Sequence, residues 1–149
     1  MLHGSDVLYV LEERAPGRPP LVTDVGVRLP AHLTASGRAV LAHLPAAQVR
    51  ALYPSATAFV HRHGMGPASL SSLRSLLTET RQRGYATETG EVTPGLSSVA
   101  VAVLDHNGVP LGGIATTYDA HEEVDLPRLV EAVSTTAHTV SRRLGRPVA

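Results

Sequence analysis

The segment RGYATETGEVTPGLSSVAVAVLDHNGVPLGGIATTY, residues 83 to 118, decides the fold of this chain. It contains two strand-like runs, 98 to 104 and 109 to 118, and the first is apolar at nearly every position. Asn107 and Gly108 lie between the runs, and Asn-Gly is a strong hairpin signal because both residues tolerate positive φ. A nearly continuous apolar run is typical of a strand that is covered on both faces. The segment therefore predicts a central antiparallel hairpin with helices or a partner on each side.

Helical patterns and a second hairpin surround this segment. The expected helices follow a cap at Thr34 or Ser36 and stop at Pro45, span 46 to 53, run from the cap Ser69 to Gly84, and run from the cap Asp125 to Gly145. Two further strands are expected at 7 to 12 and 21 to 28, with a long Pro- and Gly-rich connection between them. The resulting order, β-β-α-α-α-β-β-β-α, predicts an α+β domain with an antiparallel sheet of about five to six strands flanked by helices.

Composition limits the function classes. A chain of 149 residues is long enough for one domain with a real core, so residues 1–149 are expected to form a single domain. The 13 basic and 13 acidic residues balance and the basic ones are scattered, which does not favour a nucleic-acid surface on this segment. The absence of cysteine excludes disulfides and thiolate sites and favours the cytoplasm. No apolar run is long enough to span a bilayer, so no membrane partner is expected.

Two separated segments together resemble the effector-binding, C-terminal domain of IclR-type bacterial transcription regulators. The segment LPAHLTASGRAVLAHLP, residues 29 to 45, is similar to the family pattern L-P-x-H-x-[ST]-A-x-G-[KR]-A-x-L-A. The segment after residue 83 is similar to G-Y-x-x-[DE]-x-x-E-x-x-x-G, through Gly84, Tyr85, Glu88, Glu91 and Gly95. The order and spacing also fit, so the resemblance covers almost the whole chain. It implies the GAF/PAS-like version of the α+β fold.

The resemblance also implies what surrounds this domain. Regulators of this family have an N-terminal winged helix-turn-helix that contacts DNA, and this chain is expected to lack it. DNA is then a partner only through that absent domain. A homodimer or tetramer in the bacterial cytoplasm is expected, with a small organic effector as ligand, no cofactor and no enzyme activity.

The candidate site comes from the same resemblance, supported by residue chemistry. A helix N-terminus has unpaired N–H groups, and small residues allow close approach to them. The strand residues at 115 and 117 share one face. The ligand-binding residues expected are Leu21, Ala35, Ser36, Gly37, Glu88, Leu96, Ser98, Ala115 and Thr117. No catalytic residue is assigned.

The residue types at the site indicate the kind of effector. Ala115 stands where some members have serine, so this pocket is expected to be more apolar than one built for a two-carbon oxoacid. Glu88 disfavours a purely anionic ligand, since a second negative charge nearby costs affinity. An aromatic or hydroxy carboxylate is therefore the expected effector.

Three alternatives remain open at this point. The chain is alternatively a stand-alone GAF-like binding domain or a hydrolase that uses Ser36 with a histidine, although the first glycine of G-x-S-x-G is missing before Ser36. It is alternatively an oligomerisation-only domain with a vestigial pocket.

His61 and His63 form an H-x-H pair without a nearby Asp or Glu, so no metal is assigned.

Overall fold

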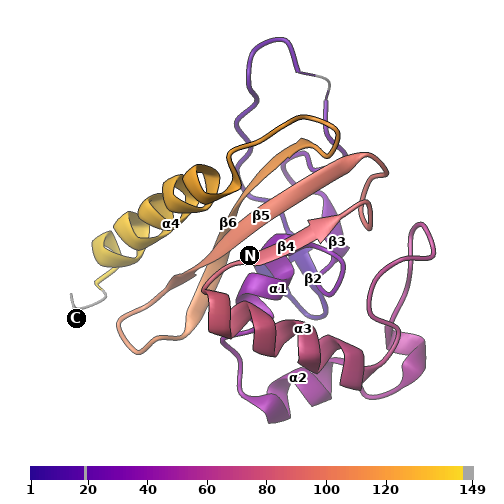
Figure 1. Cartoon of the computed structure of the whole chain (residues 1–149). Coiled ribbons are helices and arrows are strands. Elements are labelled where there is room, and N and C mark those ends of the chain that lie inside the picture. Colours follow the sequence, from indigo (N-terminus) through magenta and orange to yellow (C-terminus); the bar gives the residue numbers. More distant parts are fainter. Residues whose placement is uncertain (19, 146–149) are drawn as a thin grey trace.

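The computed structural model describes residues 1–18 and 20–145, which form an α+β domain (Figure 1). The strands are β1 (Leu2–His3), β2 (Asp6–Leu8), β3 (Arg28–Pro30), β4 (Ala86–Thr89), β5 (Leu96–Leu104) and β6 (Pro110–Asp119). The helices are α1 (Ala35–Leu41), α2 (Ala46–Leu52), the 3-10 turn η1 (Ala56–Ala58), α3 (Leu70–Arg83) and α4 (Leu126–Arg143). Within the described residues, no helix is both long and apolar enough to cross a membrane.

The strands divide into two antiparallel sheets of three, β1-β2-β3 and β4-β5-β6. In the second sheet Glu88 pairs with Ser98, which pairs in turn with Thr117. Helix α1 packs on one face of this sheet and α4 on the other (Figure 1). The expected central hairpin with both faces covered is therefore confirmed, and the six strands are split between two sheets.

Strand alternation explains which residues each helix meets. The face toward α1 is built from small residues, and Ala86, Ala100 and Ala102 pack against Ala35 and Ala39 of the helix. Small side chains let a helix lie close to a sheet. The opposite face presents larger side chains to α4, and its buried cluster comprises Val101, Val103, Val133 and Ala137. Helices α2 and α3 close a separate core with the first sheet, in which Tyr53, Phe59, Leu73 and Leu77 are buried.

The expected N-caps of α1, α3 and α4 and the end of α3 at Gly84 are confirmed, whereas α1 ends at Leu41 and not at Pro45. Thr34 is the N-cap of α1 and its side chain accepts a hydrogen bond from the backbone N–H of Gly37 at 3.0 Å. Ser69 forms a capping box with Ser72, and Gly84 ends α3 in the left-handed conformation at φ 84°. Asp125 caps α4 by accepting a hydrogen bond from the N–H of Arg128. These local signals are satisfied within one turn of helix, which is why the sequence alone reveals them.

The N-terminal hairpin differs from its prediction in strand length. The strands expected at 7 to 12 and 21 to 28 shrink to β2 and β3, which are three residues each, and β1 adds a strand before them. Between β2 and β3 the chain forms a long loop that projects past the end of the second sheet (Figure 1). Arg18 in this loop pairs with Glu122 through Nη1–Oε1 and Nη2–Oε2 distances of 2.5 and 3.0 Å. Both side chains are exposed, and solvent screens such a pair, so it adds little to the stability of the fold.

The turn of the central hairpin also differs in detail. Gly108 has a positive φ of 78°, as expected for this turn. Asn107 does not have the positive φ that was expected, because every described residue with positive φ is a glycine. Instead the Asp105 carboxylate accepts hydrogen bonds from the N–H groups of Asn107 and Val109, both at 2.8 Å. An aspartate that caps its own turn stabilises it without a second left-handed residue.

Candidate functional site

A chain of hydrogen bonds joins three polar side chains on the α1 face of the second sheet. The Ser98 hydroxyl donates to Oε1 of Glu88 at 3.0 Å, and the hydroxyls of Ser98 and Thr117 lie 2.9 Å apart. Glu88 is 5% exposed and Ser98 is 9% exposed, whereas Thr117 is half-buried. The chain therefore runs from a buried carboxylate outward to a hydroxyl near the surface.

Burial is the main reason that the pKa of Glu88 is raised above its ordinary value of 4.5. Hydrogen bonds from the Ser98 hydroxyl and from the backbone N–H groups of Glu91 and Val92 act in the opposite direction, and the charge of Glu91 adds to the increase. Glu88, which the sequence suggested as a site residue, therefore carries its carboxylate inside the domain and not on an exposed loop. A buried carboxylate with specific partners is a common feature of functional sites.

This raised pKa leads to a stability prediction. A group whose pKa is higher in the folded state binds protons more tightly there, so its contribution to stability is present below pH 4.5 and is lost as pH rises through the raised pKa. Glu88→Gln removes the titration. We therefore expect the free energy of unfolding of the wild type, relative to Glu88→Gln, to fall as pH rises across this window, measured by urea denaturation at a series of pH values. Parallel curves for the two proteins would contradict a buried, weakly acidic Glu88.

Tyr9 lies beside this network, although the sequence did not single it out. Burial raises the pKa of Tyr9, the nearby Ser36 and Thr34 side chains oppose that rise, and the charge of Glu88 reinforces it. The phenol thus stands between the start of α1 and the sheet. The available signal was strand alternation, which places Tyr9 on the same side as the buried Val7.

A buried arginine holds the loop after β4 in place. Arg38 is 3% exposed, and its Nε donates to the carbonyl of His32 at 2.8 Å while its Nη1 donates to the carbonyl of Thr87 at 2.9 Å. Its Nη2 pairs with Oε2 of Glu91. The backbone N–H of Glu91 then donates to Oε2 of Glu88 at 3.2 Å. Helix α1 is therefore linked to the carboxylate of the site through Arg38 and Glu91.

The other site residues expected from the sequence lie in three different surroundings. Ala115 is exposed and Leu96 is half-buried, and strand register places both on the same sheet face as Ser98. Ala35 and Gly37 are buried in packing: Ala35 lies among the alanines of the sheet, and a Cβ on Gly37 would collide with the backbone of Ala31. Leu21 lies half-buried in the long loop before β3, so its place at the site depends on the resemblance alone.

Ser36 occupies the junction between α1 and the sheet. The carbonyl oxygen of Ser36 would lie 3.0 Å from a Cβ on Gly113 of β6, so helix and strand are in close contact there. Two histidines of the same sequence region are engaged elsewhere: His32 Nε2 donates to the carbonyl of Val60 at 2.8 Å and His43 Nδ1 to that of Ala39 at 2.9 Å. Among the hydrogen bonds of the described residues, none joins the Ser36 hydroxyl to a histidine, whereas a nucleophilic serine needs an adjacent general base.

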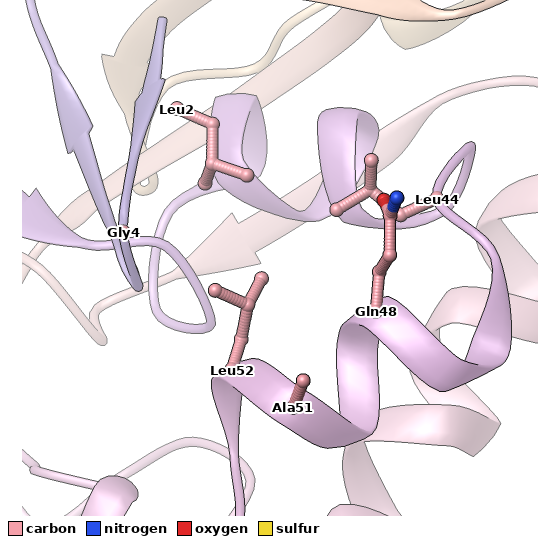
Figure 2. A pocket seen from close by; sticks show the side chains of 6 residues that line it. All are labelled: Leu2, Gly4, Leu44, Gln48, Ala51 and Leu52. Carbon is pink, nitrogen blue, oxygen red and sulfur yellow. The ribbon is translucent and has the colours of Figure 1, made fainter.

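Two hollows on the surface lie away from these residues. The first, with a volume of about 370 Å³, is lined by Leu2, Gly4, Leu44, Gln48, Ala51 and Leu52 between the first hairpin and α2 (Figure 2). Figure 2 shows three leucine side chains around it and the Gln48 amide at its edge. The second lies along the exposed side of α3. Among the described residues, no group of three or more His, Asp or Glu side chains is arranged to hold a metal ion.

Comparison with known proteins agrees with this architecture. The family model for the bacterial transcriptional regulator IclR C-terminal domain matches residues 1–142. A glycerol operon regulatory protein of Streptomyces coelicolor is 34% identical over 97% of this chain and 58% of its own length. The regulator XynR of Escherichia coli is 30% identical over 99% of this chain and 59% of its own length. The chain thus spans just under three fifths of these relatives.

Solved structures share the fold. The crystal structure of the repressor BlcR of Agobacterium tumefaciens superposes with a TM-score of 0.87 and 30% identity, covering 98% of this chain and 58% of that chain. The IclR protein of Thermotoga maritima gives a TM-score of 0.86 at 24% identity, which bears on the fold alone. The expected GAF-like α+β class is therefore confirmed. The chain belongs to the IclR family of bacterial transcription regulators and corresponds to their C-terminal, ligand-binding regulatory domain.

Proposed function

We propose that residues 1–149 form a single effector-binding and oligomerisation domain of a cytoplasmic transcription regulator. Operator binding is carried by an N-terminal winged helix-turn-helix outside this chain, and this domain has no catalytic role. The family match over residues 1–142 carries the proposal. The relatives are named as regulators, one of them of a glycerol operon, which supports control of an operon that handles a small metabolite.

The effector site lies where α1, the loop after β4 and the sheet meet. Glu88, Ser98 and Thr117 form its polar floor, and Tyr9 and Ser36 flank it. The exposed Ala115 and half-buried Leu96 form its outer, apolar part. A small number of buried polar groups beside apolar surface is the usual composition of a small-molecule site. The effector is a small organic molecule, for which an aromatic or hydroxy carboxylate is the expectation from sequence.

Regulation follows from different affinities of the effector for two arrangements of a dimer or tetramer. A ligand shifts such an equilibrium only by the difference between its affinities for the two states. The effector would contact α1, β4, β5 and β6 together. A change in the packing of α1 on the sheet would then be transmitted to other parts of the domain, because α1 also contacts α3 and β2.

The site location is tested with a blocking substitution. Ala115→Trp places an indole on the exposed part of the site, and Ala132→Trp places the same side chain on the exposed surface of α4 as a matched control. In a thermal-shift screen of small alcohols, hydroxy acids and aromatic acids, a ligand at about 100 times its Kd stabilises the native state by about 2.7 kcal/mol. We expect the shift in wild type and Ala132→Trp, and its loss in Ala115→Trp.

Two results would contradict this proposal. A ligand whose shift survives in Ala115→Trp binds elsewhere, and the hollow of Figure 2 becomes the first alternative. No shift with any compound favours the oligomerisation-only domain, and sedimentation measurements then test whether the chain still associates.

A further inference from the structure

The hydrogen bonds that join Thr117, Ser98 and Glu88 all run in one direction, toward Glu88. A carboxylate only accepts hydrogen bonds, so the single proton of the Ser98 hydroxyl is given to Glu88. The Ser98 oxygen then accepts from Thr117, whose own proton is used in that contact. Thr117, the member nearest the surface, is left with free lone pairs and no free proton. While Glu88 is ionised, the Thr117 hydroxyl at the outer end of this hydrogen-bond series can only accept a hydrogen bond from a ligand.

The charged residues around Glu88, Ser98 and Thr117 also disfavour an anionic ligand. Glu88 and Glu91 are both acidic, and the backbone N–H of Glu91 contacts the Glu88 carboxylate. Arg38 contacts this region, and each of its three nitrogens already donates to His32, Thr87 or Glu91. Arg62 reaches the loop after β4, where its Nε donates to the carbonyl of Val92. The Glu88 carboxylate itself contacts the Ser98 hydroxyl and the backbone N–H of Glu91, and no described basic side chain is hydrogen-bonded to it to offset an incoming anion. Placing a second anion near a buried one without such a partner is unfavourable.

We infer that this site selects an uncharged, hydroxyl-bearing effector, a polyol or a phenol, whose O–H donates to Thr117, and that it rejects the corresponding carboxylate. The inference rests on the proposed function, since it assumes that the effector binds at this face of the sheet. An aromatic or hydroxy carboxylate was expected from the sequence. The effector inferred here shares the hydroxyl or the aromatic ring with that expectation but has no carboxylate. Glu88 sets the selection through Ser98 and Thr117, although Glu88 itself is buried beneath them.

Matched pairs of compounds test the inference on the 149-residue chain. Each pair has the same skeleton and differs in one group: glycerol and glycerate, 1,2-propanediol and lactate, phenol and benzoate. Binding is measured by calorimetry on the wild type and on Ala115→Trp. We expect at least one alcohol to bind the wild type at least tenfold more tightly than its acid, and to lose its binding in Ala115→Trp.

Glu88→Gln separates the hydrogen-bond direction from simple shape. In this variant the amide oxygen takes the position of Oε2, where the backbone N–H of Glu91 donates to it, and the amide N–H₂ then faces Ser98. Ser98 accepts from the amide and donates to Thr117, so that Thr117 donates outward. The preference for the alcohol should then fall to threefold or less, mainly through tighter binding of the acid. Thr117→Val, which keeps the shape and removes the hydroxyl, should weaken the alcohol while leaving the acid unimproved.

The outcomes distinguish the two levels of the argument. Acids that bind the wild type as tightly as the alcohols, and lose binding in Ala115→Trp, overturn the inferred selectivity and leave the proposed site intact. An unchanged preference in Glu88→Gln also overturns the inference, because Glu88 then does not set it. If neither member of any pair binds, the effector site itself is overturned together with the inference.

Discussion

Replacing Gly37 with alanine is expected to lower the melting temperature of the chain by about 6–12 °C, corresponding to a loss of at least about 3 kcal/mol. An ideal Cβ at this position would lie 2.5 Å from Cα and 2.6 Å from the carbonyl carbon of Ala31, and closer still to its carbonyl oxygen. These are backbone atoms, so they cannot move aside as a flexible side chain would. Either α1 or the segment before it must shift.

The sign of this effect is what makes it informative. Gly37 lies inside α1, where alanine is ordinarily more stable than glycine by about 1 kcal/mol. Gly112→Ala in β6 is the matched control, because a Cβ there would meet Met1 Cγ at an ordinary 3.5 Å. Thermal denaturation of both variants is the measurement. A Gly37→Ala variant as stable as the wild type would contradict the close contact between α1 and Ala31.

This glycine shows where sequence reasoning reached and where it stopped. The pattern around residues 29 to 45 identified Gly37 as part of the site, on the ground that small residues let a ligand approach. In the structure the glycine is needed for packing, because backbone atoms of Ala31 occupy the space that a side chain at residue 37 would need. A pattern shows that a small residue is needed but not which atoms need the space, and only the tertiary contact decides that.

Local signals were predictable and long-range ones were not. Caps such as Thr34 and Ser69 are satisfied within one turn, so their sequence context is sufficient. The link from Tyr9 to Ser36 and Glu88 joins residues far apart in the chain, and one alternating strand gave the only hint of it. The lengths of β2 and β3 were overestimated because their backbone pairing continues only as far as Tyr9, whose N–H donates to Val27 and whose carbonyl accepts from Gly26. The described parts of the two β-rich runs beyond that point belong to no strand.

Arg38→Met is expected to reduce the free energy of unfolding by about 3–5 kcal/mol, as removal of one partner from a buried ion pair usually does. Methionine keeps most of the apolar stem but cannot donate. The substitution leaves the Glu91 carboxylate, which is 14% exposed, without its partner and removes the donors to the carbonyls of His32 and Thr87. Urea denaturation followed by circular dichroism measures the loss.

A double-mutant cycle with Glu91→Met divides that loss between its two causes. If the unpaired carboxylate is the larger cost, Arg38→Met combined with Glu91→Met is more stable than Arg38→Met alone, and the coupling is of the order of 0.5–3 kcal/mol. The two carbonyls still lack their donors, so recovery is incomplete. Strictly additive effects would show that Arg38 acts through the carbonyls alone. Coupling would instead show that the ion pair fixes the loop whose N–H contacts Glu88, and hence that α1 and the proposed effector site share one network.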